Sequence, residues 1–341
     1  MVVADDDDPG AENRRLPTVT LEGWRQFVQE KPAALTLLPR PAVDAMDAPE
    51  REAYDERRIA YHSELVVVET APMRAIINRG RMLTLLNQRE ISARRSLIVD
   101  GPWASGKSTT IKMLGKVHEQ SVRRRWPGQD RIPVVYITTP PKGSPRKLAS
   151  EFAHFLGIPS RARFNTSDIA DAVCHVLTEA RTDLVIVDEI HNLNLATSAG
   201  EDMSDHLKYF TEHMPATFIY AGINVERSGL FTGVRGKQIS GRSVLMRTGT
   251  FACDDEWRGL VATLDSALRL YDHAPGTLTR NGKFLHRRTG GSISSLSQLV
   301  RSAALTAIIT GTEAVTRALL EETPVDHAAE QITPRDERTA Q

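Results

Sequence analysis

Five short apolar runs along the chain predict β-strands, and the stretches between them predict helices. In the run at 132–137 the apolar residues follow one another without alternation, which is typical of a strand buried on both faces. Segments 109–117 and 166–180 instead carry apolar residues at helical spacing. This succession predicts an α/β fold with a five-stranded parallel sheet between helices. The predicted strands lie at residues 96–100, 132–137, 184–187, 217–222 and 243–247.

The chain changes character after residue 252, where one helical pattern follows another. Trp257, Leu260 and Leu264 recur at the spacing of a helix face that packs into a core. Near the other end, an arm of scattered apolar residues should pack on another surface, such as that of a neighbouring subunit. The charged stretch 50–63 should form a surface helix. We therefore expect an acidic disordered tail at 1–17, an N-terminal arm and helix at 18–62, an α/β core at 63–252, a small all-helical lid domain at 253–322 and a flexible C-terminal tail at 323–341.

Composition narrows the kinds of partner and compartment. Lysine plus arginine equals aspartate plus glutamate, at 43 each, so any contact with a polyanion must come from local patches. The two cysteines, Cys174 and Cys253, lack nearby metal-ligand spacing, which favours a reducing cytoplasm over a zinc site. No apolar run approaches the ~20 residues that span a bilayer, and the N-terminus lacks the pattern of a signal peptide. We expect a soluble, cytoplasmic protein without a membrane partner.

The segment from Gly101 to Ser108 matches the phosphate-binding pattern G-x-x-x-x-G-K-[ST] at every fixed position. A predicted strand leads into it and a predicted helix leaves it, which is the context that this loop requires. Lys107 would reach the β and γ phosphates of ATP, and the Ser108 hydroxyl would hold Mg²⁺. The alternative is a glycine-rich turn that happens to contain a lysine. The expected nucleotide-binding residues are Gly101, Pro102, Trp103, Ala104, Ser105, Gly106, Lys107, Ser108 and Thr109.

Two adjacent carboxylates, Asp188 and Glu189, follow the apolar run at 184–187. Downstream of a phosphate loop, such a pair indicates ATP hydrolysis, in which Asp188 orders the Mg²⁺ shell and Glu189 is the general base toward water. An ordinary acidic turn at the end of a strand is the alternative. Asn224 follows the run at 217–222, where a polar residue senses the γ phosphate in many ring ATPases; an ordinary turn residue is again the alternative.

Two groups of basic residues are candidates for contacts with other molecules. Arg235 and Arg242 lie in a predicted loop, from which either could reach a neighbouring subunit's nucleotide and stabilise charge on the transferred phosphoryl group. Each could instead be a solvated surface arginine. Lys142, Arg146 and Lys147 gather at the turn after the run at 132–137 and are the candidates for contacts with DNA phosphates.

Three motifs together give the chain a family resemblance over about residues 55–310. They are the phosphate loop, the Asp-Glu-x-His motif at 188–191 and the Gly-Gly-x-Ile-x-x-Leu motif at 290–296 within the helical part. With these, the chain resembles AAA+ ATPases. Within that superfamily it most resembles the TniB-type transposition regulators, relatives of the target-selection ATPases of Mu-like elements, and an Arg/Tyr/His-rich lead-in at 54–62 adds to this resemblance.

The resemblance implies an ATP-bound homo-oligomer, ring or filament, that binds duplex DNA, recruits a transposase with or without a target-selection protein, and disassembles on hydrolysis. The chain departs from many AAA+ members at 292–296, which lacks a lid arginine, so that role falls to Arg287, to Arg288 or to no residue. One alternative is a signalling or antiphage ATPase that controls an effector protein without DNA. A small-molecule kinase is another, but the adjacent carboxylates indicate water as the nucleophile.

Overall fold

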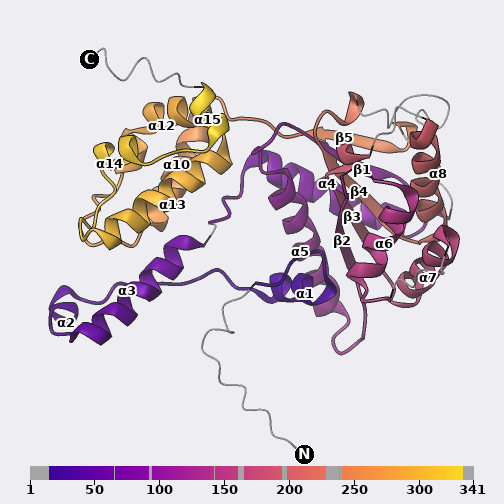
Figure 1. The fold of residues 1–341 in the computed structure, drawn as a ribbon, viewed down its shortest axis with the longest axis horizontal. Helices are drawn as coiled ribbons and strands as arrows, with labels where there is room; N and C mark the ends of the chain where they lie inside the picture. Colours follow the sequence, from indigo (N-terminus) through magenta and orange to yellow (C-terminus); the bar gives the residue numbers. More distant parts are fainter. Residues whose placement is uncertain are drawn as a thin grey trace, which may run out of the picture. The chain divides into compact units, whose positions relative to one another are not determined.

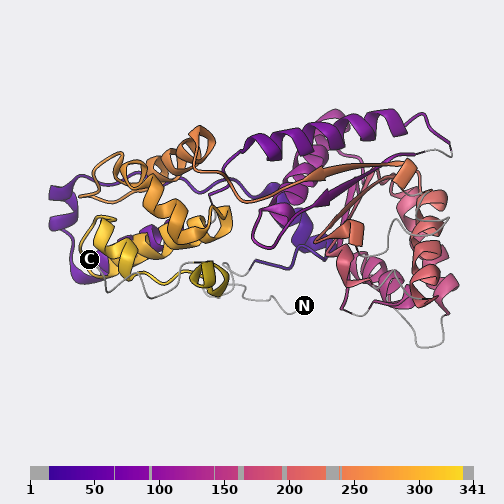
Figure 2. The same ribbon diagram turned by 90° about the horizontal axis from the view of Figure 1, so that it is seen from above.

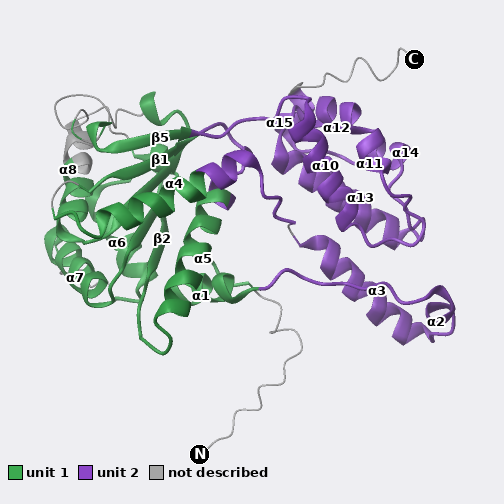
Figure 3. Cartoon of the chain, turned by 180° about the vertical axis from the view of Figure 1, so that it is seen from behind, with its two compact units in different colours: residues 1–30, 76–100, 110–246 green, residues 31–75, 101–109, 247–341 purple. Residues whose placement is uncertain are grey.

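The computed structural model forms two compact units (Figure 3). It describes residues 15–64, 66–91, 94–141, 143–159, 165–193, 198–227, 238 and 240–332. The described parts of residues 1–30, 76–100 and 110–246 form unit 1, and those of 31–75, 101–109 and 247–341 form unit 2. These bounds differ from the expected division at 62 and 252, because 31–75 and the phosphate loop group with the C-terminal helices.

Unit 1 is built on the predicted five-stranded parallel sheet, which the structure confirms. The strand order is β2-β3-β4-β1-β5, and the pairings of β1 with β4, β4 with β3, and β3 with β2 are parallel. Strand β2 begins after Pro133, which has no N–H to donate, but the Pro133 carbonyl still accepts from the N–H groups of Asp183 and Leu184. The strands are β1 (Ser96–Asp100), β2 (Val134–Thr138), β3 (Leu184–Asp188), β4 (Thr217–Gly222) and β5 (Ser243–Arg247).

Helices cover both faces of this sheet (Figures 1 and 2). Since β1 connects to the distant strand β2, while the later connections run back across the sheet, right-handed crossovers place α5 on one face and α6, α7 and α8 on the other. Helices α1 and α4 lie on the side of α5 (Figure 1). The bounds are α1 (Leu21–Gln29), α4 (Ala71–Asn87), α5 (Lys107–Arg125), α6 (Pro145–Phe155), α7 (Thr166–Glu179) and α8 (Ser198–His213), with short 3-10 helices η1 (Ile190–Asn192) and η2 (Val225–Arg227).

The first part of the N-terminal arm packs on the core of its own chain. Trp24 of α1 is fully buried, stacks on Tyr136 of β2, and donates from Nε1 to Glu119 Oε2 at 2.6 Å. Gly115 of α5 permits this approach, because a Cβ at this position would lie 2.7 Å from the indole. Helix α1 is therefore an integral part of unit 1.

Unit 2 consists of helices around a second apolar core formed mainly by α10 and α13. Within the described residues, no single helix is long and apolar enough to cross a membrane; the sharply bent pair α12 and α13 passes that test by length and composition only. The helices are α2 (Arg40–Asp44), α3 (Ala48–Ser63), α10 (Asp255–Ala267), α11 (Thr277–Arg280), α12 (Gly282–Thr289), α13 (Ile293–Ile309), α14 (Arg317–Glu322) and α15 (His327–Ile332).

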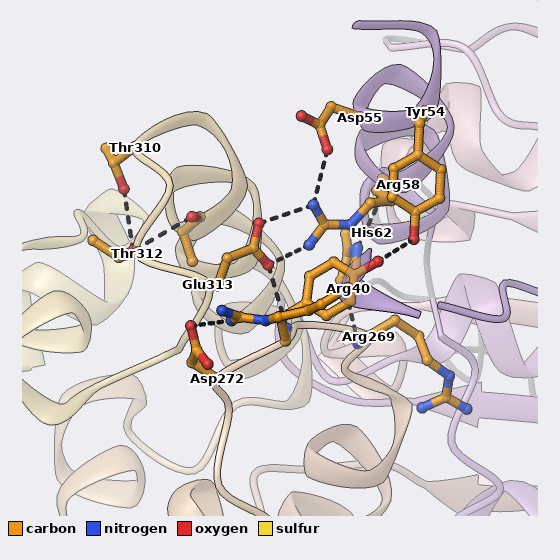
Figure 4. A network of polar contacts seen from close by, with 12 residues as sticks. Arg40, Tyr54, Asp55, Arg58, His62, Arg269, Asp272, Thr310, Thr312 and Glu313 are labelled. Atoms are coloured by element: carbon orange, nitrogen blue, oxygen red, sulfur yellow. Dashed lines mark hydrogen bonds and ion pairs between the residues drawn. The ribbon is translucent and has the colours of Figure 1, made fainter. Parts of the chain in front are cut away.

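Two segments of unit 2 differ from the expectations for them. Helix α3, expected on the surface, buries Tyr54, Arg58 and His62 against the C-terminal helices (Figure 4). The Tyr54 hydroxyl shares a hydrogen bond of 2.8 Å with that of Tyr271. The segment expected to be a flexible tail after residue 322 contains α15, whose Ala329 is buried. Both segments acquire structure through partners that are remote in sequence, which local composition does not reveal.

Candidate nucleotide site

The phosphate loop has the backbone that its glycines predict. Gly106 adopts a positive φ of 79°, and Gly101 has no room for a side chain because a Cβ there would lie 2.3 Å from Thr248 Oγ1. The loop follows β1 without a break, and Lys107 is the first residue of α5. The loop therefore leads directly into the N-terminus of α5. Backbone N–H groups at a helix N-terminus commonly bind phosphate.

The side chains of the loop differ sharply in exposure. Lys107 is only 6% exposed and donates from Nζ to the carbonyls of Gly101 at 2.8 Å and Pro102 at 2.6 Å. Ser108 is half-buried on the first turn of α5, whereas Trp103 is 76% exposed. The loop thus keeps its lysine against its own backbone and presents its tryptophan to solvent.

Residues from the C-terminal part of unit 2 hold the loop in place. Ser105 Oγ lies 2.8 Å from Thr248 Oγ1, and Ser292 Oγ donates to the Ala104 carbonyl at 3.2 Å. Ser292 also caps α13. Sequence reasoning missed Thr248 and assigned Ser292 no contact with the loop; its place after two glycines at a helix start was the only available signal.

Of the two arginines considered for the lid, one is occupied elsewhere. Arg288 is 7% exposed and donates from Nε to the Leu320 carbonyl at 3.1 Å and from Nη2 to the Thr323 carbonyl at 2.6 Å. It therefore anchors α14 within unit 2. Arg287 is exposed.

In unit 1, the acidic pair lies at the carboxyl end of β3. Asp188 is 2% exposed; its Oδ1 accepts from the Glu189 N–H and its Oδ2 accepts from the Tyr136 hydroxyl, both at 2.8 Å. Glu189 has a left-handed backbone with φ of 57°, a conformation that costs a residue with a side chain ~1 kcal/mol or more. This left-handed residue forms the turn between β3 and η1.

Tyr136 is a further residue whose contact with the site the sequence did not reveal. Burial, and secondarily the negative charge of Asp188, raises the pKa of the Tyr136 phenol, so it remains a donor toward Asp188. Lys112 Nζ lies 4.9 Å from the centre of the same ring, and burial lowers the pKa of this amine. A tyrosine inside an otherwise aliphatic strand was the signal that could have identified this site.

The end of β4 lies beside these carboxylates in the sheet. The parallel register pairs Asp100, the last residue of β1, with Gly222 of β4, and Asp100 Oδ1 accepts from the Val225 N–H at 3.1 Å. Asn224 has φ of 50° and is exposed at this end of β4. Strands β1, β4 and β3 are neighbours in this order and run parallel. The edge of the sheet formed by their carboxyl ends therefore carries Asp100, Asn224 and Asp188.

The other candidates lie apart from this edge or outside the described residues. Arg242 is exposed, and its carbonyl accepts from the N–H of Ser96, the first residue of β1, so it lies at the opposite end of that strand from Asp100. Arg146 and Lys147 are exposed on the first turn of α6. Arg235 and Lys142 lie outside the described residues.

Comparison with solved structures supports the fold. The Aeropyrum pernix ORC2 protein, in ADPNP and ADP complexes, is 15% identical and has a TM-score of 0.58, with 78% of this chain and 71% of that chain covered. The ORC1 protein of the same organism, in complex with DNA, is 14% identical with a TM-score of 0.57, covering 77% and 66%. Cdc6p from Pyrobaculum aerophilum is 15% identical with a TM-score of 0.53, covering 76% and 69%.

These identities establish likeness of fold alone, and the fold is that of an AAA+ P-loop protein. Compared with curated proteins, the chain finds no match. A family model for the bacterial TniB protein matches residues 58–238, more than half of the chain. The match includes the phosphate loop, the acidic pair and Asn224. The chain therefore belongs to the family of bacterial TniB proteins.

Proposed function

We propose that this protein is an Mg²⁺-dependent ATPase whose nucleotide-bound oligomer binds duplex DNA and recruits or activates a transposase. In the hydrolytic step, Glu189 takes a proton from water while the water oxygen bonds to the γ phosphorus. The bond from that phosphorus to the β-phosphate oxygen breaks, and its electron pair leaves on ADP. The products are ADP and inorganic phosphate, and their formation disassembles the oligomer.

The observation that carries the proposal is the placement of Glu189. It stands in a left-handed turn directly after a buried strand, beside an aspartate whose two oxygens already accept hydrogen bonds. The phosphate loop follows β1, which only β4 separates from β3 in the sheet. Chain connectivity thus supports one nucleotide served by both motifs.

The residues present suit Mg²⁺ chemically. Mg²⁺ prefers oxygen ligands and is commonly held by one or two carboxylates together with substrate phosphates and water. Asp188 and Ser108 would supply a carboxylate and a hydroxyl, and the ion would neutralise charge on the phosphates. Within the described residues, no group of three or more histidine, cysteine, aspartate or glutamate side chains gathers as a self-sufficient metal site.

Family membership supports the transposition role, and local charge supports the DNA contact. Arg146 and Lys147 are exposed on α6 and, with Lys142, would bind backbone phosphates. Asn224 would sense the γ phosphate. Arg235 or Arg242 would reach the nucleotide of a neighbouring subunit, since Arg242 lies at the end of β1 remote from its own chain's phosphate loop.

Phosphate release by the Glu189→Gln variant tests the hydrolytic part. We expect ATP binding to persist and turnover to fall by ~100-fold or more, because the base is removed while Asp188 remains. Glu179→Gln, at the exposed end of α7, is the matched control. Unchanged turnover in Glu189→Gln would exclude Glu189 as the base.

Duplex binding with a non-hydrolysable ATP analogue tests the DNA part. Affinity should fall steeply with salt, and Arg146→Ala with Lys147→Ala should weaken binding and reduce the salt slope by about two. Lys283→Ala, an exposed lysine on α12, is the control. Absence of any affinity at low salt would overturn this part and favour a signalling ATPase that acts on a protein effector.

A further inference from the structure

His191 joins the acidic pair to the end of β4. The residue lies in η1, and its Nε2 is 3.2 Å from Glu189 Oε2. Its other ring nitrogen, Nδ1, lies 3.3 Å from the N–H of Ile223. A single imidazole therefore contacts both the carboxylate of Glu189 and the backbone just before Asn224.

The contact with β4 determines which nitrogen carries the proton. A backbone N–H can only donate, so Nδ1 of His191 must accept from Ile223 and be unprotonated. In the neutral ring the proton then lies on Nε2, the nitrogen that is 3.2 Å from Glu189 Oε2. The contact with β4 thus gives the neutral histidine a defined tautomer, whose remaining N–H is on the nitrogen nearest the Glu189 carboxylate.

The backbone around His191 holds this arrangement closely. Gly222 has no room for a side chain, because a Cβ there would lie 2.7 Å from Ile190 Cγ2 and 3.3 Å from the backbone nitrogen of His191. Ile190 is fully buried, and Asn192 donates from Nδ2 to the Thr139 carbonyl at 2.9 Å. These contacts hold η1 between the end of β4 and the residue after β2.

We infer that His191 is a positioning residue for the general base. Its Nε2–H holds Oε2 of Glu189, which leaves Oε1 as the oxygen that receives the proton of the attacking water. Because Nδ1 contacts Ile223, the carboxylate is aligned with the end of β4, next to the proposed γ-phosphate sensor Asn224. This inference rests on the proposed function. It provides a route by which contact between Asn224 and the γ phosphate would affect the position of the Glu189 carboxylate.

Two substitutions separate the two polar contacts of the His191 ring. In His191→Asn, the amide oxygen takes the place of Nδ1, so the bond from Ile223 is retained and the bond to Glu189 is lost. In His191→Gln, the amide nitrogen takes the place of Nε2, so the bond to Glu189 is retained and the bond from Ile223 is lost. The order of their activities therefore distinguishes alignment of Glu189 from simple attachment of η1 to β4.

Steady-state ATP hydrolysis by the full-length chain is the test. We expect His191→Asn to lower kcat by roughly 10- to 100-fold with little change in KM and Tm, since a misplaced catalytic group costs up to that much. His191→Gln should recover most of the loss. His175→Asn, an exposed histidine on α7, should behave as the unaltered chain.

The opposite results would overturn the inference. If His191→Asn kept full turnover, or if His191→Gln were the slower variant, His191 would serve only to attach η1 to β4. Glu189→Gln, measured in parallel, distinguishes this failure from failure of the proposed function. Loss of turnover in Glu189→Gln with full turnover in His191→Asn would overturn the inference alone, whereas full turnover in Glu189→Gln would overturn both.

Discussion

Arg58 and Glu313 form a two-pronged ion pair between segments 255 positions apart in the sequence. Arg58 donates from Nη1 to Glu313 Oε1 at 2.9 Å and from Nη2 to Oε2, and the arginine is fully buried (Figure 4). Asp55 accepts a further bond of 2.9 Å from Nη1. The pair ties α3 to the turn between α13 and α14 and so makes the N-terminal helix part of unit 2.

Arg58→Leu should destabilise unit 2 by about 3–5 kcal/mol, because it leaves the Glu313 carboxylate buried without its cation. Chemical denaturation followed by circular dichroism measures the change. Arg57→Leu, which removes an exposed arginine from the same helix, should cost less than about 1 kcal/mol. Combining Arg58→Leu with Glu313→Leu should restore part of the loss. Equal losses in the Arg58 and Arg57 variants would contradict the buried pair.

Acidification should destabilise unit 2 through His62. Burial lowers the pKa of this imidazole. Its Nε2 accepts from the backbone N–H of Arg269 at 3.0 Å, and its Nδ1 contacts the Arg58 carbonyl at 2.8 Å. Protonation would remove the acceptor. The unfolded chain, with a pKa of about 6.5, therefore binds the proton more readily than the folded chain, so stability is complete above pH 6.5 and falls as pH drops below it.

The size of this effect is at most about 1.4 kcal/mol per pH unit until the pKa of the folded state is reached. Thermal unfolding between pH 7.5 and 5.5 measures it. His62→Gln retains an acceptor for Arg269 but does not titrate, so it should flatten the profile. The unaltered chain must be compared with His62→Gln because burial also lowers the pKa of His206 in unit 1, which would add its own pH dependence to both profiles. Identical profiles in both proteins would remove His62 from this role.

Tyr136→Phe should weaken the metal-dependent step. The substitution removes the hydroxyl that donates to Asp188 Oδ2, and loss of such a supporting bond commonly costs 10- to 100-fold in metal affinity or activity. The Mg²⁺ concentration required for half-maximal ATP hydrolysis is the measurement. Tyr220→Phe on β4 is the control, since both tyrosines are 3% exposed. A similar Mg²⁺ requirement in the two variants would contradict the role given to Tyr136.

Lys107→Ala should weaken ATP binding itself by about 10-fold or more, because the lysine charge would face the β and γ phosphates. Isothermal titration with a non-hydrolysable analogue measures the affinity. Lys283→Ala controls for removal of a lysine charge elsewhere. An unaltered affinity in Lys107→Ala would count against the phosphate loop as the nucleotide site.

The sequence alone determined the features that depend on neighbouring residues. Apolar runs predicted all five strands. Strands β1 to β4 are buried along almost their whole length, and such strands need little beyond their own residues to be recognised. The loop at 101–108 and the acidic pair at 188–189 were visible because their residues are contiguous, and their positions at the ends of β1 and β3 follow from the parallel sheet.

Tertiary structure decided the features that join distant segments. No local pattern pairs Arg58 with Glu313, Tyr136 with Asp188 or His191 with Ile223. Each pairing arises where the chain path brings remote backbone together, so the placement of α3 and the alignment of Glu189 could not be read from spacing. The residue types of the candidate site were therefore set by sequence, while the contacts that orient them were set by packing.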